Sequence, residues 1–259
     1  MTAAESYLWG YHPIVEAIRA RRREIFKIYL ARETSSARRE TIAVLAREAG
    51  ILVQWVTTAQ LTIIIGHRRH QGLGAQVSAY PLCTVDEILT LHSGSWQAPF
   101  VLILDQIVDP HNLGALTRTA HCAGVHGVIM TKDRSAPPSA AVSKVSAGAL
   151  EHIRLARVTN LVSTIKSLKT AGLWIAGADR NGDQVLFNAD LKGPLALVIG
   201  GEEKGLRPLV KKHCDLVLAI PQTGTIGSLN ASVAAAVIMY EVFRQRRSAA
   251  SVPLDGKGG

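Results

Sequence analysis

The segment Leu216–Val233 reads Leu-Val-Leu-Ala-Ile-Pro-Gln-Thr-Gly-Thr-Ile-Gly-Ser-Leu-Asn-Ala-Ser-Val. An apolar run that ends at Ile220 before a proline is typical of a buried strand. Two glycines then allow close approach to the backbone, and Ser228 and Asn230 are residue types that begin helices. A helix is predicted from Ala231 to about Arg246. This order predicts a small-molecule site at the carboxyl edge of a sheet, although an ordinary strand-to-helix turn shows the same pattern.

Strand and helix patterns alternate from Pro99 to this segment. The predicted strands are Phe100–Leu104, Gly127–Met130, Leu173–Ala178, Leu195–Ile199 and Leu216–Ile220. The predicted helices are Leu113–Ala123, Ala140–Leu150, Asn160–Ala171 and Leu206–His213. Such alternation predicts an α/β fold with a mainly parallel sheet that is covered on both faces.

The chain is expected to divide into four parts. Residues 1–79 predict a small αβ unit, and residues 80–98, of mixed composition, are interpreted as a linker. Residues 99–247 carry the alternating pattern. Residues 248–259 are small, polar and glycine-ended, so a disordered tail is expected there.

The charge favours a polyanionic partner, and nucleic acid is the first candidate. The net charge is +9, and residues 1–79 hold 11 Lys and Arg against 6 Asp and Glu. The remaining residues hold 18 against 14, so the positive charge is concentrated at the front. A generic basic protein is the alternative.

Two basic clusters lie in this front part. The predicted RNA-binding residues are Arg19, Arg21, Arg22, Arg23, Arg68 and Arg69. Arginine suits phosphate contact, but a solvated helix end explains the first cluster equally well. His67 and His70 flank the second cluster without a nearby carboxylate or cysteine, so no metal site is expected.

The cysteines indicate the compartment. There are three, at Cys83, Cys122 and Cys214, and none forms a Cys-x-x-Cys pair. A zinc ribbon or redox dithiol is therefore not expected. The small, odd number of cysteines suits a protein of a reducing compartment. With no apolar run of membrane-spanning length and no signal-type start, a soluble cytoplasmic protein is predicted.

A first loop, Asp105–Ala120, follows the strand that begins at Phe100. Asn112 is predicted to cap the following helix, and Arg118 is predicted to lie in its second turn, facing the loop. A cap and an ordinary surface arginine are the alternative interpretation.

A second loop, Ile199–Leu206, carries Gly200 and Gly201 directly after a strand, which suggests close approach of a ligand. Glu202 and Glu203 also suit a helix start for electrostatic reasons alone. The loop has neither the Gly-x-Gly-x-x-Gly nor the Gly-Lys-Ser/Thr pattern, which disfavours a nucleotide-phosphate site.

Together the three loops resemble the signature motifs of the SPOUT superfamily, specifically the TrmH/RlmB-like RNA ribose 2′-O-methyltransferases. The matching residues are Asp109-Pro-His-Asn-Leu-Gly-Ala with Arg118-Thr-Ala, then Gly200-x-Glu202-x-x-Gly205, then Ile220-Pro, Gly224 and Ser228-Leu-Asn-x-Ser232. At the front, Gly10-Tyr-His-Pro-Ile-Val-Glu-Ala and His70-Gln-Gly resemble the family's L30e-like RNA-binding domain.

The resemblance implies a trefoil-knotted catalytic domain, S-adenosyl-L-methionine as cofactor, and a homodimer formed through the C-terminal domain. It implies methylation of an RNA ribose, most specifically a guanosine of 23S rRNA in the peptidyl-transferase P loop. The implied cofactor-binding residues are Gly200, Gly205, Ile220, Ser228 and Leu229. The implied catalytic residues are Asn112, Arg118, Glu202, Ser228 and Asn230. Glu203 and Gln222 depart from the residues that are usual in the family.

Three alternatives stay open. In the first alternative, the enzyme methylates a tRNA ribose or another rRNA ribose. In the second, the chain is a non-catalytic RNA-binding or ribosome-assembly protein with the same fold. A dinucleotide-dependent oxidoreductase is the third, and it lacks its glycine fingerprint. Whether Arg118 acts as a base or stabilises charge is also open.

Overall fold

The computed structural model describes residues 6–33, 36–90, 98–202, 205–224 and 227–250. They form two compact units. The first unit contains the chain up to Leu82 and two later segments, Asp109–Arg118 and Ala136–Ile153. The second unit contains Cys83–Val108, Thr119–Ser135 and the chain from Arg154 onward. The predicted boundaries at 79, 98 and 247 stay predictions.

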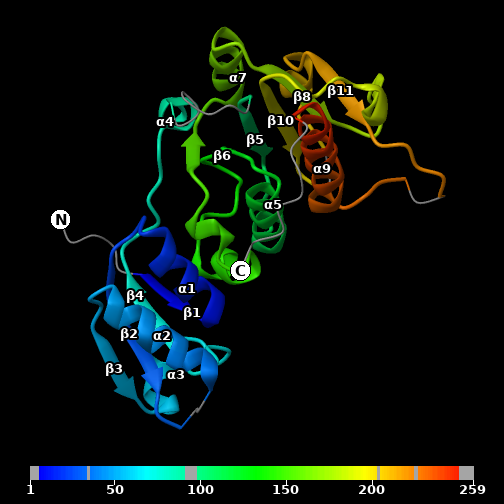
Figure 1. Cartoon of the computed structure of the whole chain (residues 1–259). Coiled ribbons are helices and arrows are strands. Elements are labelled where there is room, and N and C mark those ends of the chain that lie inside the picture. Colours follow the sequence, from blue (N-terminus) through cyan, green and yellow to red (C-terminus); the bar gives the residue numbers. More distant parts are fainter. Residues whose placement is uncertain (1–5, 34–35, 91–97, 203–204, 225–226, 251–259) are drawn as a thin grey trace. The chain divides into compact units, whose positions relative to one another are not determined.

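The first unit is built on a four-stranded sheet in the order β1-β4-β2-β3 (Figure 1). Its strands are β1 (Ser6–Trp9), β2 (Ile25–Ala31), β3 (Val53–Val56) and β4 (Leu73–Val77). Its helices are α1 (Tyr11–Ala20), α2 (Ala37–Glu48), α3 (Thr58–Ile65), α6 (Ala140–Val145) and the 3-10 turn η1 (Ala149–Glu151). Side-chain caps fix several starts; Ser36 accepts a hydrogen bond from Arg39 N–H, for example.

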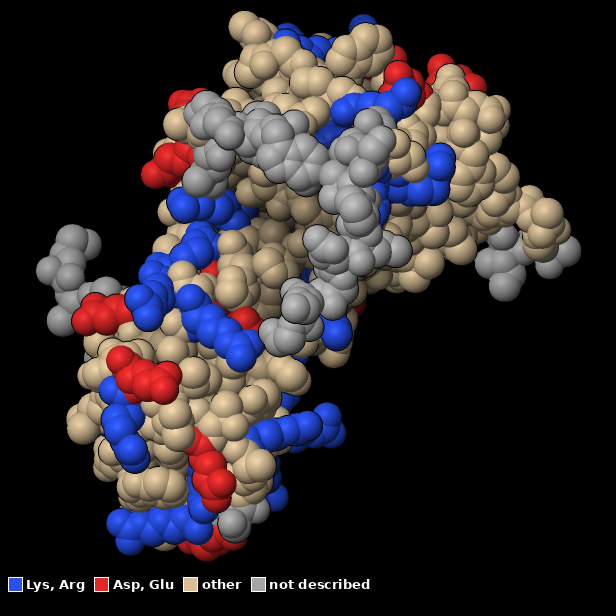
Figure 2. Space-filling view, in the orientation of Figure 1, with Lys and Arg blue, Asp and Glu red and all other residues tan. Residues whose placement is uncertain are grey.

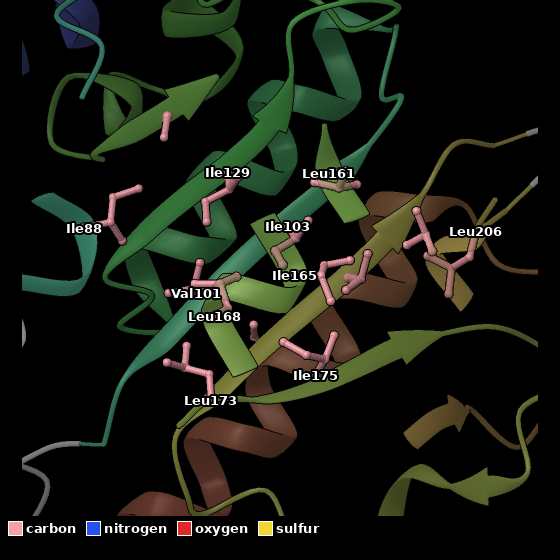
Figure 3. Packing of buried hydrophobic residues seen from close by; sticks show 14 residues of the cluster. Ile88, Val101, Ile103, Ile129, Leu161, Ile165, Leu168, Leu173, Ile175 and Leu206 are labelled. Carbon is pink, nitrogen blue, oxygen red and sulfur yellow. The ribbon is translucent and has the colours of Figure 1, made fainter. Parts of the chain in front are cut away.

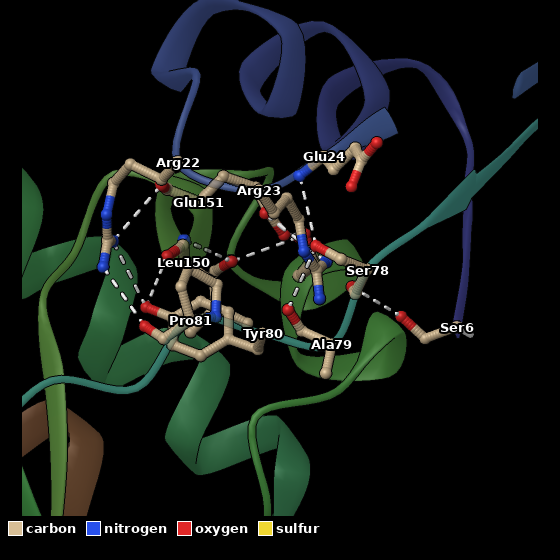
Figure 4. Close-up of polar contacts among 12 residues, drawn as sticks. Ser6, Arg22, Arg23, Glu24, Ser78, Ala79, Tyr80, Pro81, Leu150 and Glu151 are labelled. Atoms are coloured by element: carbon tan, nitrogen blue, oxygen red, sulfur yellow. Dashed lines mark hydrogen bonds and ion pairs between the residues drawn. The ribbon is translucent and has the colours of Figure 1, made fainter. Parts of the chain in front are cut away.

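Residues from the later segments join the front sheet through buried polar contacts (Figure 4). The Arg23 guanidinium lies 3.5 Å from Glu151 Oε2, and their side chains are only 6% and 1% exposed. Arg22 donates to the carbonyl of Ile153, and Tyr80 Oη donates to that of Leu150 at 3.0 Å. The front of the chain is therefore tied to residues 150–153.

The second unit holds a seven-stranded sheet in the order β7-β6-β5-β10-β8-β11-β9, with every adjacent pair parallel. Its strands are β5 (Phe100–Asp105), β6 (Gly127–Thr131), β7 (Leu155–Val158), β8 (Trp174–Ala178), β9 (Gln184–Val185), β10 (Leu195–Gly200) and β11 (Leu216–Ala219). This confirms the predicted α/β fold with a mainly parallel sheet. The trefoil knot stays a prediction.

The helices of the second unit are α4 (Val85–Thr90), α7 (Leu161–Thr170), α8 (Pro208–Lys212), α9 (Ala231–Ala250) and the 3-10 turn η2 (Leu186–Asn188), while α5 (Pro110–Cys122) has residues in both units. A core cluster packs α4 and α7 on one side of the central strands through Ile88, Ile103, Leu161, Ile165 and Ile175 (Figure 3). Burying such aliphatic side chains stabilises the fold by about 1.5–3 kcal/mol each.

Two predicted helices differ from the structure. The helix predicted over Ala140–Leu150 is interrupted, because Ala147 and Gly148 adopt positive φ angles of 53° and 84°. The C-terminal helix, predicted to end at about Arg246, continues to Ala250. Arg246 Nη1 donates to the carbonyl of Ala98 at 2.7 Å, which anchors α9 beside the start of β5. Residues 251–259 of the predicted tail lie outside the described residues.

A buried histidine makes the first unit sensitive to pH. His70 Nδ1 accepts a hydrogen bond from Gly72 N–H, and its Nε2 lies 3.0 Å from Thr62 Oγ1. Burial, and secondarily the charge of His67, lowers the pKa of His70 below its ordinary value of 6.5. The unfolded chain therefore takes up a proton that the folded chain resists, so protonation of His70 costs no stability well above pH 6.5 and destabilises the fold increasingly as the pH falls below it.

We expect the His70→Asn variant to lose less stability than the parent protein between pH 7.5 and 5.5, in urea denaturation. Asparagine keeps an acceptor for Gly72 N–H but does not titrate. His12→Asn, which changes an exposed histidine of α1, is the control and should behave like the parent. An identical pH dependence in all three proteins contradicts the assignment.

Among the described residues, no helix combines the length and hydropathy required to cross a membrane.

Candidate active site and cofactor pocket

A pocket of about 390 Å³ opens at the carboxyl ends of β8, β10 and β11, beside the start of α9. It is lined by Ala178, Asp179, Arg180, Asn181, Ile199, Gly200, Gly201, Glu202, Gly205, Leu218, Ile220, Gln222, Ser228, Leu229, Ala231, Ala234 and Ile238. Residues of the second and third loops thus line one pocket. All five predicted cofactor-binding residues line it, as does Glu202, and their roles stay predictions.

Glycines give the second loop its shape. A Cβ on Gly200 would lie 2.1 Å from the carbonyl carbon of Gly205, and one on Gly201 would lie 2.9 Å from Gln106 O. Gly205 has a φ of 60°, and its N–H donates to Gly201 O at 2.9 Å. The loop therefore folds back on itself so tightly that backbone, and no side chain, faces the pocket at Gly200.

An ion pair that the sequence did not single out anchors this loop. Asp105, fully buried at the end of β5, accepts from Arg207 Nε at 2.8 Å and from Arg207 N–H at 3.3 Å. Arg207 directly precedes α8 and lies two residues after Gly205. Asp105 thus fixes where the loop returns to the sheet.

We expect Asp105→Asn to weaken S-adenosylmethionine binding about tenfold, because the new amide N–H would oppose an N–H donor of Arg207. Binding is measured by calorimetry, without RNA. Asp190→Asn is the control, since its exposed carboxylate lies 3.7 Å from Lys192 Nζ. Equal affinities for the two variants contradict an anchoring role.

The third loop ends in a helix cap. Asn230 Oδ1 accepts from Ser232 N–H at 2.9 Å and from Val233 N–H at 3.3 Å, which satisfies the start of α9. Ser232 Oγ donates to the same oxygen at 2.6 Å. Asn230 is not among the residues that line the pocket, and its catalytic assignment stays a prediction.

The first loop corrects the predicted cap. α5 begins at Pro110, and Asp109 Oδ1 accepts from His111 N–H at 3.0 Å. That hydrogen bond opposes and exceeds the effect of burial, so it lowers the pKa of Asp109. Asn112 is instead a buried residue inside the first turn, donating from Nδ2 to Asp109 Oδ2 at 3.3 Å. The prediction that Asn112 is the N-cap is wrong, because proline suits the first helical position and aspartate the cap before it.

Arg118 is exposed and lies in the third turn of α5, one turn later than predicted. It is separated from Asn112 by about 9 Å along the helix axis. Both residues belong to the first unit, whereas the pocket belongs to the second. Their participation in the site therefore stays a prediction.

The residues after β8 were missed by the sequence analysis. Asp179, Arg180 and Asn181 line the pocket. Burial raises the pKa of Asp179, but the hydrogen bond from Asn181 N–H and the ion pair with Lys211 at 3.0 Å outweigh it, so the net shift is downward. Their position at the end of a predicted parallel strand was the signal that could have identified them.

The predicted RNA-binding arginines fall into two groups. Arg19, Arg21, Arg68 and Arg69 are exposed, and on the face in Figure 2 basic side chains cover more area than acidic ones. Arg22 and Arg23 instead turn inward to the carbonyl of Ile153 and to Glu151. The guanidinium groups of these two arginines are thus engaged by protein oxygens, and their predicted contact with RNA stays a prediction.

Comparisons with known proteins agree with this geometry. The model of the SpoU rRNA methylase family matches residues 99–240, and that for RNA 2′-O ribose methyltransferase substrate binding matches residues 7–83. YacO of Bacillus subtilis (strain 168), named for the TrmH family of tRNA/rRNA methyltransferases, is 39% identical over 95% of this chain and 98% of its own. The 23S rRNA (guanosine-2′-O-)-methyltransferase RlmB of Ralstonia nicotianae is 39% identical over 92% of this chain and 95% of its own.

A solved structure is also similar over most of its length. The SpoU methyltransferase AviRb from Streptomyces viridochromogenes, crystallised with the cofactor AdoMet, has a TM-score of 0.77 and 26% identity over 94% of this chain and 91% of that chain. The predicted family and the predicted class of enzyme are confirmed. The chain therefore belongs to the SpoU rRNA methylase family, and it is an RNA ribose methyltransferase.

Proposed function

We propose that this protein transfers a methyl group from S-adenosylmethionine to a ribose 2′-hydroxyl of 23S rRNA, at a guanosine of the peptidyl-transferase loop. The observation that carries the proposal is the convergence of Gly200, Ile220 and Leu229 on one pocket. The RlmB relatives, which are named 23S rRNA (guanosine-2′-O-)-methyltransferases, support the choice of a 23S rRNA guanosine over a tRNA ribose.

The pocket residues fit such a cofactor. The volume of about 390 Å³ lies within the range of small-molecule sites. The apolar side chains of Ile220 and Leu229 suit the faces of an adenine ring, and the exposed backbone at Gly200 and Gly205 suits its polar edge. Leu229 is 40% exposed, which leaves its side chain free to cover a ligand.

When bound, the sulfonium supplies a methyl carbon that is attacked in line by O2′, so positioning contributes much of the rate. In our proposal Arg118 contacts the phosphate and stabilises the negative charge that develops on O2′. A role as general base is disfavoured, because an arginine side chain keeps its proton below about pH 12. Asn112, Glu202, Ser228 and Asn230 would orient the ribose, Arg118 or the methionine end of the cofactor.

We also propose a cytoplasmic homodimer formed through the second unit. Val233 and Tyr240 are 48% and 50% exposed on α9. They are two turns apart on one face of the helix, which suits packing against a second copy.

Mapping ribose methylation in total RNA from cells with and without the gene tests the function. We expect loss of one 2′-O-methylguanosine in 23S rRNA and its return when the gene is restored. Loss at a tRNA ribose supports the alternative substrate instead. An unchanged methylation map contradicts methyl transfer and favours a non-catalytic role in ribosome assembly.

A further inference from the structure

A tight turn after β8 holds an exposed arginine at the rim of the cofactor pocket. Asp179 N–H donates to Leu218 O at 3.0 Å, and Gly182 N–H donates to Asp179 O at 3.0 Å, so the chain closes a β-turn against β11. A Cβ on Gly182 would lie 2.4 Å from a carbonyl oxygen of β11, so the turn packs on that strand as closely as glycine allows. Arg180 is the second residue of this turn and is exposed. Its backbone is therefore fixed on both sides.

The guanidinium of Arg180 reaches the loop that precedes α9. A Cβ built on Gly227 would lie 3.1 Å from Arg180 Nη1, which places this nitrogen beside the backbone just before Ser228. Arg180 also lines the same pocket as Ser228 and Leu229. The side chain thus extends from the end of β8 to the third loop, along the wall of the pocket.

The carboxylate next to Arg180 in the sequence is engaged elsewhere. Asp179 Oδ2 accepts from Lys211 Nζ at 3.0 Å, and Asp179 Oδ1 accepts from Asn181 N–H at 2.8 Å. Within the described part of the chain, none of the ion pairs includes Arg180. A guanidinium offers five N–H donors in a planar fork that matches a carboxylate. Arg180 therefore has the capacity to bind the carboxylate of a ligand.

The charges of the pocket match those of S-adenosylmethionine. Of the described residues that line the pocket, Arg180 is the one lysine or arginine, whereas Asp179 and Glu202 bring two carboxylates. The cofactor has the opposite set, with one carboxylate on its methionine end and two positive groups, the sulfonium and the α-ammonium. Like charges repel at short range, so the cofactor carboxylate is disfavoured beside Asp179 or Glu202. Arg180 is left as its complementary partner.

We propose that Arg180 binds the carboxylate of S-adenosylmethionine and thereby orients the methionine end of the cofactor. This inference rests on the proposed use of the pocket for that cofactor. Arg180 lies outside the three loops that carry the family resemblance, so it adds a residue to the binding site. The fixed turn favours binding, because only the side chain of Arg180 has to be ordered when the ligand enters.

The test titrates the full-length protein by calorimetry, without RNA, with three ligands that differ in one group each. They are S-adenosylmethionine, S-adenosylhomocysteine, which keeps the carboxylate but lacks the sulfonium, and decarboxylated S-adenosylmethionine, which lacks the carboxylate. Arg180→Gln is expected to weaken binding of the first two about tenfold. Its affinity for the decarboxylated ligand should stay within about twofold of the parent value, because that ligand offers the guanidinium no partner.

Lys166→Gln is the matched control, because it removes an exposed cation from α7, outside the pocket. It should bind all three ligands like the parent protein. Arg180→Lys keeps the charge and should bind S-adenosylmethionine more tightly than Arg180→Gln does. The melting temperature of each variant shows whether it is folded.

Two results overturn the inference. One is parent-like affinity of Arg180→Gln for S-adenosylmethionine, including the case in which only RNA binding is weakened. The other is an equal loss for all three ligands, which means that the substitution altered the pocket and not one contact. Failure of the proposed function is distinct, since the parent protein itself would then bind none of the three ligands.

Discussion

Replacing Arg118 by alanine is expected to reduce methyl transfer by about 1,000-fold or more, with S-adenosylmethionine binding within about twofold of the parent protein. The guanidinium is proposed to act on the RNA ribose and phosphate. Its loss therefore removes stabilisation of the charge that forms on O2′ without altering the pocket residues. Single-turnover transfer to 23S rRNA and calorimetric cofactor titration measure the two effects separately.

The control for this variant is Arg47→Ala, which removes one exposed arginine from the end of α2. It should retain full transfer. Near-parent activity in Arg118→Ala would remove this residue from the mechanism, and equal losses of activity and cofactor affinity would assign it a role in binding S-adenosylmethionine.

The Gly200→Ala variant is expected to lose about 100-fold or more in affinity for S-adenosylmethionine. The new Cβ would lie 2.1 Å from Gly205 C and 2.4 Å from Leu206 N, and these are backbone atoms that cannot rotate away. The displacement costs about 3 kcal/mol or more, which corresponds to roughly 100-fold in a dissociation constant. The melting temperature should fall as well, because β10 ends at this residue.

Gly193→Ala provides the matched control, since a Cβ at Gly193 meets nothing within 4 Å. Gly193 lies two residues before β10, and Gly200 is the last residue of that strand, so both variants change a glycine near a terminus of β10. Parent-like cofactor affinity in Gly200→Ala would show that the turn from Gly200 to Gly205 does not shape the binding site.

Much of the sheet follows from the sequence because buried parallel strands are continuous apolar runs. The run predicted at Phe100–Leu104 is β5, and that at Leu195–Ile199 is β10. Two strands of the seven-stranded sheet were not predicted. β9 has only two residues, and β7 contains Arg157, which interrupts its apolar pattern.

The site was only partly predictable, because sequence motifs are local whereas some contacts of the site join distant residues. Gly200 and Leu229 belong to motifs that are local in sequence and were identified. The partnership of Asp105 with Arg207 joins residues 102 positions apart, and no local pattern predicts which buried carboxylate meets which arginine. The cap at Asp109 was missed because Asp109 and Asn112 are both good capping residues, and only the course of the backbone distinguishes them.

The contacts of Tyr80 and Arg23 also bear on biosynthesis. Tyr80 and its acceptor at Leu150 are 70 residues apart, so the front sheet emerges from the ribosome about 4–14 s before these partners. During that interval the guanidinium of Arg23 has no Glu151 to neutralise it. In a nascent chain that pauses between these positions, Tyr80 and Arg23 therefore face water, and the contacts that join the front sheet to residues 150–153 form only afterwards.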